Sequence, residues 1–257
     1  MRSRYPFLSL IALLVTLTAA TSCRQPEVLV KHIIFDPDDI ELLVGGFKRV
    51  SVSTYPHYAD NEKDLEFIVG NKKVAAYDGT SVVGLSEGKT EILATCGDVS
   101  STCQVRVFEW YLSLEKTDYG ISTTDAQLND KGPGSPKELE IKLSHDTRSP
   151  RHQFTVWIPV DLLGQKIDLT QQIAGVFVSG TYDGTRDGYV VATMSTEEAK
   201  VYHADWSAAE DVTVVKGSVL VDRKGGLGNQ FSVKADVLLS NGFQFGAEWE
   251  GKLPVTF

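Results

Sequence analysis

The chain has 257 residues, and its 42% hydrophobic content is enough to form the cores of one large domain or of two ordinary ones. Its formal net charge is −9, which excludes nucleic acid as a partner because nucleic-acid binding needs a basic surface. It has three cysteines, an odd number, so they cannot all be paired within one chain.

The first 22 residues have the pattern of a secretory signal. Arg2 and Arg4 form a short basic region, an apolar run follows over residues 5–20, and small residues at 19–22 lead to Cys23. The apolar run is shorter than the roughly 20 residues that a membrane-spanning helix needs, so we expect it to be cleaved. Cleavage would remove two arginines and no acidic residue, which takes the net charge from −9 to −11.

This N-terminus resembles a bacterial lipoprotein signal, in which the cysteine after the small residues becomes acylated and N-terminal. The resemblance implies that residues 1–22 are the signal peptide, that Cys23 is the lipid anchor and that residues 23–30 are a tether. The membrane is then a partner through the lipid, and we expect the protein in the cell envelope, at the outer membrane, with its periplasmic or cell-surface face left open. The alternative is a plain signal peptide with Cys23 as a spare thiol.

The other two cysteines lie in two alternating segments. Residues 90–96 place Ile92, Ala94 and Cys96 on one face, and residues 103–107 alternate in the same way from Cys103. If the segments pair with Cys96 opposite Cys103, all the apolar residues share one face and the sulfurs are within disulfide range. We therefore predict a Cys96–Cys103 disulfide, with two buried free thiols as the alternative.

Residues 31–108 resemble a bacterial immunoglobulin-like domain of group 2. The resemblance is carried by LLVGG at 42–46, Pro56 in STYPHYA, LEF at 65–67, KKVAAYDG at 72–79, VVGLSEGKTEILAT at 82–95 and CQVRV at 103–107. It implies a small β-sandwich of about seven strands. Such domains serve as spacers or adhesion modules on bacterial surface proteins.

Residues 109–257 are predicted to form a second domain. Short alternating segments separated by Gly-, Pro- and Asp-rich breaks indicate a β-sandwich or a partly closed barrel, so the whole chain is predicted to be all-β. Residues 195–202 alone have helical character. The likeness of this domain to known proteins is carried by WIPVDLLGQKIDLT at 157–170, KGSVLVDR at 216–223 and NQFSVKADVLLSNGFQFGAEWEGKL at 229–253. These segments are similar to C-terminal domains of uncharacterised lipoproteins of gut anaerobes, a likeness that brings no known activity with it.

The last hairpin allows a prediction at single-residue resolution. A two-residue Asn241-Gly242 turn would put the apolar faces of its two strands on opposite sides. A three-residue loop at 240–242 instead pairs Val237 with Phe245, Val233 with Trp249, and Lys234 with Glu248. Gly242 can take the left-handed conformation in which such loops end, so we predict the three-residue loop.

The sequence contains no nucleophile, Walker or dinucleotide motif, so we expect no enzyme, no cofactor and no metal site. His145, Asp146 and His152 lie close together in the sequence and could meet at a metal, but their spacing is not that of a metal site. Asp-Gly repeats at 183–188 fit a hairpin turn better than a calcium loop. Paired carboxylates of a cryptic glycoside hydrolase are kept as a lesser alternative.

Aromatic side chains are the candidates for ligand binding. In the segment 153–160, Phe154, Val156 and Ile158 share one face, so Trp157 points to the other, where it could stack against a sugar ring. Alternatively, it could lie under a loop, at the domain junction or in a second buried face. Tyr182, Tyr189 and Tyr202 complete the candidate set. We therefore expect a non-catalytic binding protein for surface glycan, with an envelope component that binds another protein as the alternative.

Overall fold

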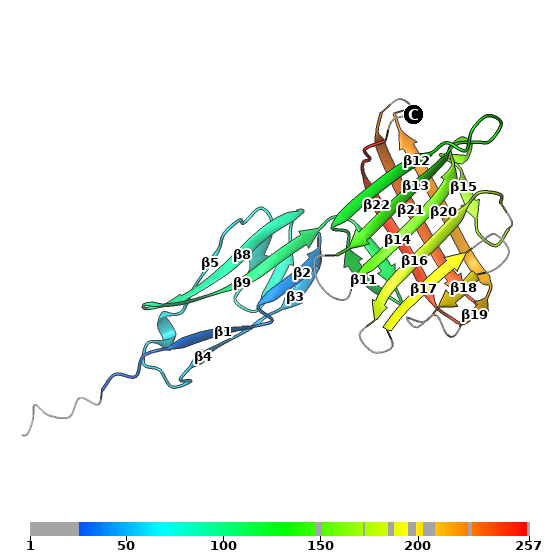
Figure 1. Cartoon of the computed structure of the whole chain (residues 1–257). Helices are drawn as coiled ribbons and strands as arrows, with labels where there is room; N and C mark the ends of the chain where they lie inside the picture. The colour runs from blue at the N-terminus through cyan, green and yellow to red at the C-terminus, as the bar shows by residue number, and fades with distance from the viewer. Residues whose placement is uncertain are drawn as a thin grey trace, which may run out of the picture.

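The computed structural model describes residues 26–146, 151–171, 173–184, 188–194, 199–202, 209–225 and 228–255, and from 182 to 212 it describes the strand backbone only. Two β-rich bodies follow one another, end to end (Figure 1). Each has its own buried cluster, one within residues 30–107 and the other within 112–255. The chain is all-β, as predicted: in the described part, the helical segments are two short 3₁₀ turns, Glu62–Asp64 and Val160–Leu162.

The first body contains nine strands in three small sheets. The strands are β1 (His32–Asp36), β2 (Asp39–Leu43), β3 (Phe47–Arg49), β4 (Ser51–Tyr55), β5 (Glu66–Val69), β6 (Ala75–Tyr77), β7 (Ser81–Gly84), β8 (Gly88–Cys96) and β9 (Val99–Phe108). The sheet orders are β1-β4, β2-β9-β8-β5 and β3-β7-β6, with β2 parallel to β9. Apolar residues alternate inward, as Ile33 and Phe35 do on β1, and this alternation is what closes the sandwich.

The second body is a sandwich of two larger sheets. Its strands are β10 (Tyr111–Leu114), β11 (Thr117–Gly120), β12 (Thr123–Asn129), β13 (Glu138–His145), β14 (His152–Pro159), β15 (Lys166–Asp168), β16 (Phe177–Gly184), β17 (Gly188–Met194), β18 (Ala199–Tyr202), β19 (Ala209–Val212), β20 (Val214–Lys224), β21 (Gln230–Leu239) and β22 (Gln244–Lys252). A six-stranded sheet has the order β11-β10-β22-β21-β20-β15, and a seven-stranded sheet has the order β12-β13-β14-β16-β17-β18-β19.

The core of the second body lies between these two sheets. Phe154 of the seven-stranded sheet and Phe245 of the six-stranded sheet are both fully buried, with ring centroids 6.3 Å apart. The alternation of β13 and β21 supplies every second residue to the same core. The opposite face of each sheet carries mostly polar side chains, and a ligand can bind to these outer faces.

The last hairpin has the predicted three-residue loop. Val237 lies opposite Phe245, Val233 opposite Trp249, and Lys234 opposite Glu248. The Leu239 amide donates to the Phe243 carbonyl at 2.9 Å, and Gly242 has a φ of +87°. The prediction is confirmed.

The Cys96–Cys103 disulfide prediction is wrong. A two-residue Gly97-Asp98 turn pairs Cys96 with Val99, which places Cys103 opposite Ile92, and both cysteines are free and buried. The predicted and observed registers differ by an even number of residues, so both put the same side chains on the inner face. The apolar pattern therefore could not distinguish them, and the turn decides.

The helical expectation at 195–202 is also wrong where it can be checked. Ala199–Tyr202 forms β18, which pairs with β17 and β19, while 195–198 lie outside the described residues. Neighbouring strands on both sides override a weak local helix preference.

Candidate functional site

Trp157 lies on the outer face of the seven-stranded sheet, as its alternation predicts. Its neighbours Phe154, Val156 and Ile158 are buried at 1% exposure or less, whereas Trp157 itself is half-buried. It is therefore not a residue of the sandwich core. It is also less open than a free stacking platform would be.

The cross-strand neighbours of Trp157 give this surface its character. Glu140 of β13 lies opposite it on one side and Phe177 of β16 on the other. Phe177 is 36% exposed, so an aromatic surface borders a carboxylate there. Glu140 also pairs with Lys142 at 2.8 Å. An apolar ring surface beside an oriented acceptor matches the two chemistries of a sugar, its C–H face and its hydroxyls.

The three candidate tyrosines lie on strands of this same sheet. Tyr182 is opposite His152, Tyr189 opposite Asp183, and Tyr202 opposite Val191. Their side chains are outside the described residues, so their role stays a prediction. The Asp-Gly segment at 183–188 joins β16 to β17, which pair as a hairpin. Cys23 and the signal segment also lie outside the described residues.

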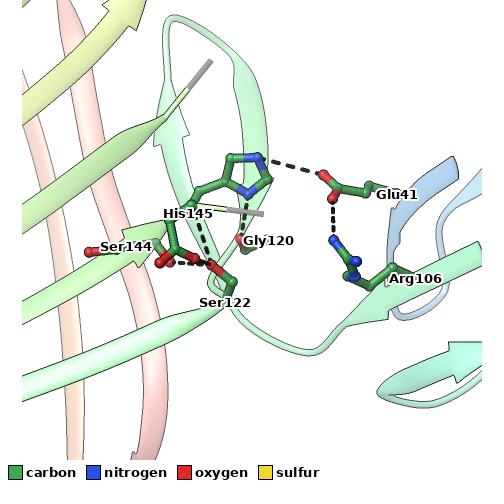
Figure 2. Close-up of polar contacts among 7 residues, drawn as sticks. Glu41, Arg106, Gly120, Ser122, Ser144 and His145 are labelled. Atoms are coloured by element: carbon green, nitrogen blue, oxygen red, sulfur yellow. Dashed lines mark hydrogen bonds and ion pairs between the residues drawn. The ribbon is translucent and has the colours of Figure 1, made fainter. Parts of the chain in front are cut away.

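A polar network joins the two bodies where β2 approaches β11 (Figure 2). Glu41 of the first body pairs with Arg106 of the same body at 3.1 Å, and its other oxygen lies 3.6 Å from His145 Nε2 of the second. His145 Nδ1 lies 2.8 Å from the Gly120 carbonyl. Since a carbonyl can only accept, Nδ1 carries a proton. The ion pair with Glu41 then forms when Nε2 is protonated as well.

A second set of contacts holds the strand ends beside His145. The Ser122 hydroxyl donates to Asp146 and lies 3.0 Å from the Ser144 carbonyl, and the Thr123 hydroxyl donates to the same carboxylate at 3.1 Å. The hydrogen bond from Ser122, followed by that from Thr123, lowers the pKa of Asp146. Asp146 is therefore an ionised anchor for the chain entering the second body.

Two of the candidate metal ligands, His145 and His152, lie next to each other across a strand pair. His145 and His152 are paired across β13 and β14, with ring centroids 6.1 Å apart. Within the described ranges, no group of three His, Cys, Asp or Glu residues is arranged to hold a metal ion. Over the same ranges, no helix has the length and apolarity needed to cross a bilayer.

Sequence reasoning missed a groove on the outer face of the six-stranded sheet. It has a volume of about 680 Å³ and is lined by residues of β10, β11, β15, β20, β21 and β22. The signal in the sequence is the run of small residues at outward positions, such as Gly246 between Gln244 and Glu248. Read alone, those positions are typical of an ordinary solvated strand face.

Comparison with known proteins supports the reading of the first body. Residues 29–107 match the family model described as bacterial Ig-like domain (group 2), which confirms the resemblance for this part of the chain. No curated protein matches the sequence. Among solved structures, domains 5–6 of the S-layer protein SbsC are similar over 70% of this chain and 93% of that one, at 11% identity and a TM-score of 0.28. A likeness at that level supports no statement about function.

Proposed function

We propose that this chain is a non-catalytic protein of the cell envelope, in which the Ig-like domain presents a second β-sandwich that binds surface glycan. The observation that carries the proposal is the outward position of Trp157 beside the 36% exposed Phe177 and the carboxylate of Glu140. Binding needs only this surface, and no reacting group is required of it. A fold alone assigns no function, so the surface is what must be tested.

The envelope location rests on the N-terminus and on the first domain. A lipid on Cys23 would hold the protein on a membrane, because several acyl chains anchor durably where one does not. Ig-like domains of group 2 suit a spacer on a bacterial surface. The residues between Cys23 and β1 would then set the distance from the membrane.

The test is Trp157→Ala in the full chain, measured on a glycan array and by urea unfolding. We expect glycan binding to be lost and the free energy of unfolding to fall by about 1–2 kcal/mol, since the side chain is only half-buried. Trp249→Ala is the matched control: Trp249 is 6% exposed in the core, so its loss should cost about 3–5 kcal/mol. Binding that survives Trp157→Ala, or a core-sized stability loss, would refute the proposed surface.

A protein-binding role is the second candidate, favoured by apolar residues exposed on the Ig-like domain. Phe47 is 70% exposed, and Val44 and Leu85 are 43% and 47% exposed. They belong to segments that are hydrogen-bonded through Gly45 and Gly84 at 2.9 Å. A photo-crosslinking residue at position 47, compared with one at exposed Asp125, would identify a partner specific to this patch. Equal crosslinking at both positions would remove this candidate.

A further inference from the structure

The groove on the six-stranded sheet lies on the opposite side of the sandwich from Trp157. Its floor is one row of outward positions that run straight across the strands: Ser113 lies opposite Gly246, Gly246 opposite Asp236, and Asp236 opposite Ser218. Three of these four residues have small side chains or none. The row is therefore a trench between rows of larger residues.

Gly246 is what keeps the middle of the floor low. A Cβ added there would collide with the Ala235 backbone carbonyl, so no larger residue fits without a backbone shift. The glycine is also buried, although it faces outward, because the walls on either side stand above it. The hollow is thus built into the strand pairing and does not depend on a loop.

One wall is a row of long side chains that hold one another in place. Tyr111, Glu248, Lys234, Leu220 and Lys166 succeed one another across five strands. Glu248 accepts from the Tyr111 hydroxyl at 3.1 Å and from Lys234 at 3.2 Å. Burial, together with this hydrogen bond, raises the pKa of Tyr111, so the phenol keeps its proton and stays a donor. These polar groups are oriented before any ligand arrives.

The floor and the second wall are organised in the same way. Gln244 donates its amide to Asp236 at 3.1 Å. The second wall is the row next to Asp236, in which Lys216 lies opposite Leu238 and Leu238 lies opposite Gln244. Leu220, at an outward position, adds an apolar side chain beside these amide and carboxylate groups.

The charges of the groove are nearly balanced. The groove and the hollow that continues it at β15 are lined by three lysines and four carboxylates: Lys166, Lys216, Lys234, Asp118, Asp168, Asp236 and Glu248. The carboxylates would repel a polyanion, and the lysines would repel a polycation. A ligand that both donates and accepts hydrogen bonds without net charge satisfies all of them.

The length of the groove indicates a chain and not a single small molecule. It crosses five neighbouring strands from β10 to β15, and strands lie about 4.8 Å apart, which gives a trench of roughly 19 Å. Several sugar units in a row fill such a length.

From this geometry we infer a second binding site, independent of the Trp157 surface: the groove floored by Ser113, Gly246, Asp236 and Ser218 takes a segment of an uncharged polysaccharide chain. Hydroxyl groups bridge the oriented acids and lysines of the walls, and the sugar rings pack on the low floor. The inference goes beyond the proposed function, because it lies on the other sheet and does not need Trp157.

The test is affinity gel electrophoresis of the full chain in gels that contain hydroxyethylcellulose, galactomannan, xylan or dextran, with polygalacturonate and dextran sulfate as charged comparisons. Ser218→Trp fills the floor, and Ser232→Trp is the matched control, half-buried on the same outer face but outside the groove. We expect at least one neutral polysaccharide to retard the protein, and Ser218→Trp to weaken binding at least tenfold. Ser232→Trp should leave this retardation unchanged.

Salt adds a second readout that does not depend on a variant folding. Binding of an uncharged chain should change by less than about twofold between about 20 mM and 500 mM salt, because ionic screening weakens only charge-driven binding. No retardation by any of the four neutral polymers would overturn the inference. So would binding that survives Ser218→Trp, or a preference for the charged polymers that fades with salt. Loss with Trp157→Ala alone would assign the glycan to the first surface instead.

Discussion

Gly120, at the junction of the two bodies, lies so close to Phe108 that a single added methyl group should destabilise the fold. A Cβ at Gly120 would lie 2.6 Å from Phe108 Cβ and closer still to its ring. Those atoms are near the backbone of Phe108 and cannot swing aside as the end of a flexible side chain can. Gly120→Ala should therefore displace Phe108, which is only 5% exposed, or strain β11 itself.

The expected cost follows from these two outcomes. Inserting a methyl group into a packed site costs about 1–3 kcal/mol, and exposing a phenylalanine costs about 1.5–3 kcal/mol. We expect Gly120→Ala to lower the free energy of unfolding by about 2–4 kcal/mol, measured by urea unfolding of the full chain. Gly70→Ala is the control, since an added Cβ there finds ordinary contacts at 3.5 Å, and it should cost less than about 1 kcal/mol.

A double-mutant cycle decides whether Phe108 is the cause. In a Phe108→Gly background, which removes both the ring and its Cβ, the added methyl has room, so Gly120→Ala should cost less than about 0.5 kcal/mol there. If Gly120→Ala costs as much without the Phe108 ring as with it, the clash is not the source of the effect. The reasoning about this junction would then be refuted.

Two further predictions follow from the cysteines and from the last hairpin. Burial raises the pKa of Cys103 to about 11, with Asp38 and Asp39 adding to it, and burial also raises that of Cys96. In a Cys23→Ser form, a thiol reagent should label neither Cys96 nor Cys103 in the folded protein and should label both after urea unfolds the chain. If both stay unlabelled in unfolded protein that has not been reduced, the two cysteines are paired in a disulfide after all. The unfolded chain ionises first as the pH rises, so stability should be unaffected by Cys103 below about pH 9 and should fall between about pH 9 and 11. Gly242→Ala should cost about 1–2 kcal/mol because its φ of +87° is left-handed; an unchanged midpoint in urea would contradict the three-residue loop.

The two hairpins explain how far alternation can predict a register. At the last hairpin the competing loops differ by one residue, so one of them sends the apolar face of a strand to solvent, and the pattern is decisive. At the Cys96 hairpin the competing registers place the same side chains on the inner face, so the apolar pattern fits both registers equally. The Gly97-Asp98 turn carries the missing information, because a two-residue loop fixes the pairing on its own.

The sites depend on contacts that no local pattern contains. Glu41 and His145 are far apart in the sequence and meet only because β2 and β11 lie at the junction. The groove needs residues from six strands to lie side by side, and none of them alone indicates a binding site. Trp157 was predictable because its own strand places it off the core. Its cross-strand neighbour Phe177 could not be predicted, because that contact depends on the pairing of β14 with β16.

The free cysteines also change the case for the lipid anchor. An odd number of cysteines singles out Cys23 only if the other two pair, and they do not. However, Cys96 and Cys103 are almost fully buried, and their raised pKa values keep them as protonated, unreactive thiols, so they are not a liability in an exported protein. They need no partner to be tolerated. The case for acylation of Cys23 therefore rests on the residues before it, the basic start, the short apolar run and the small residues at 19–22, and no longer on counting cysteines.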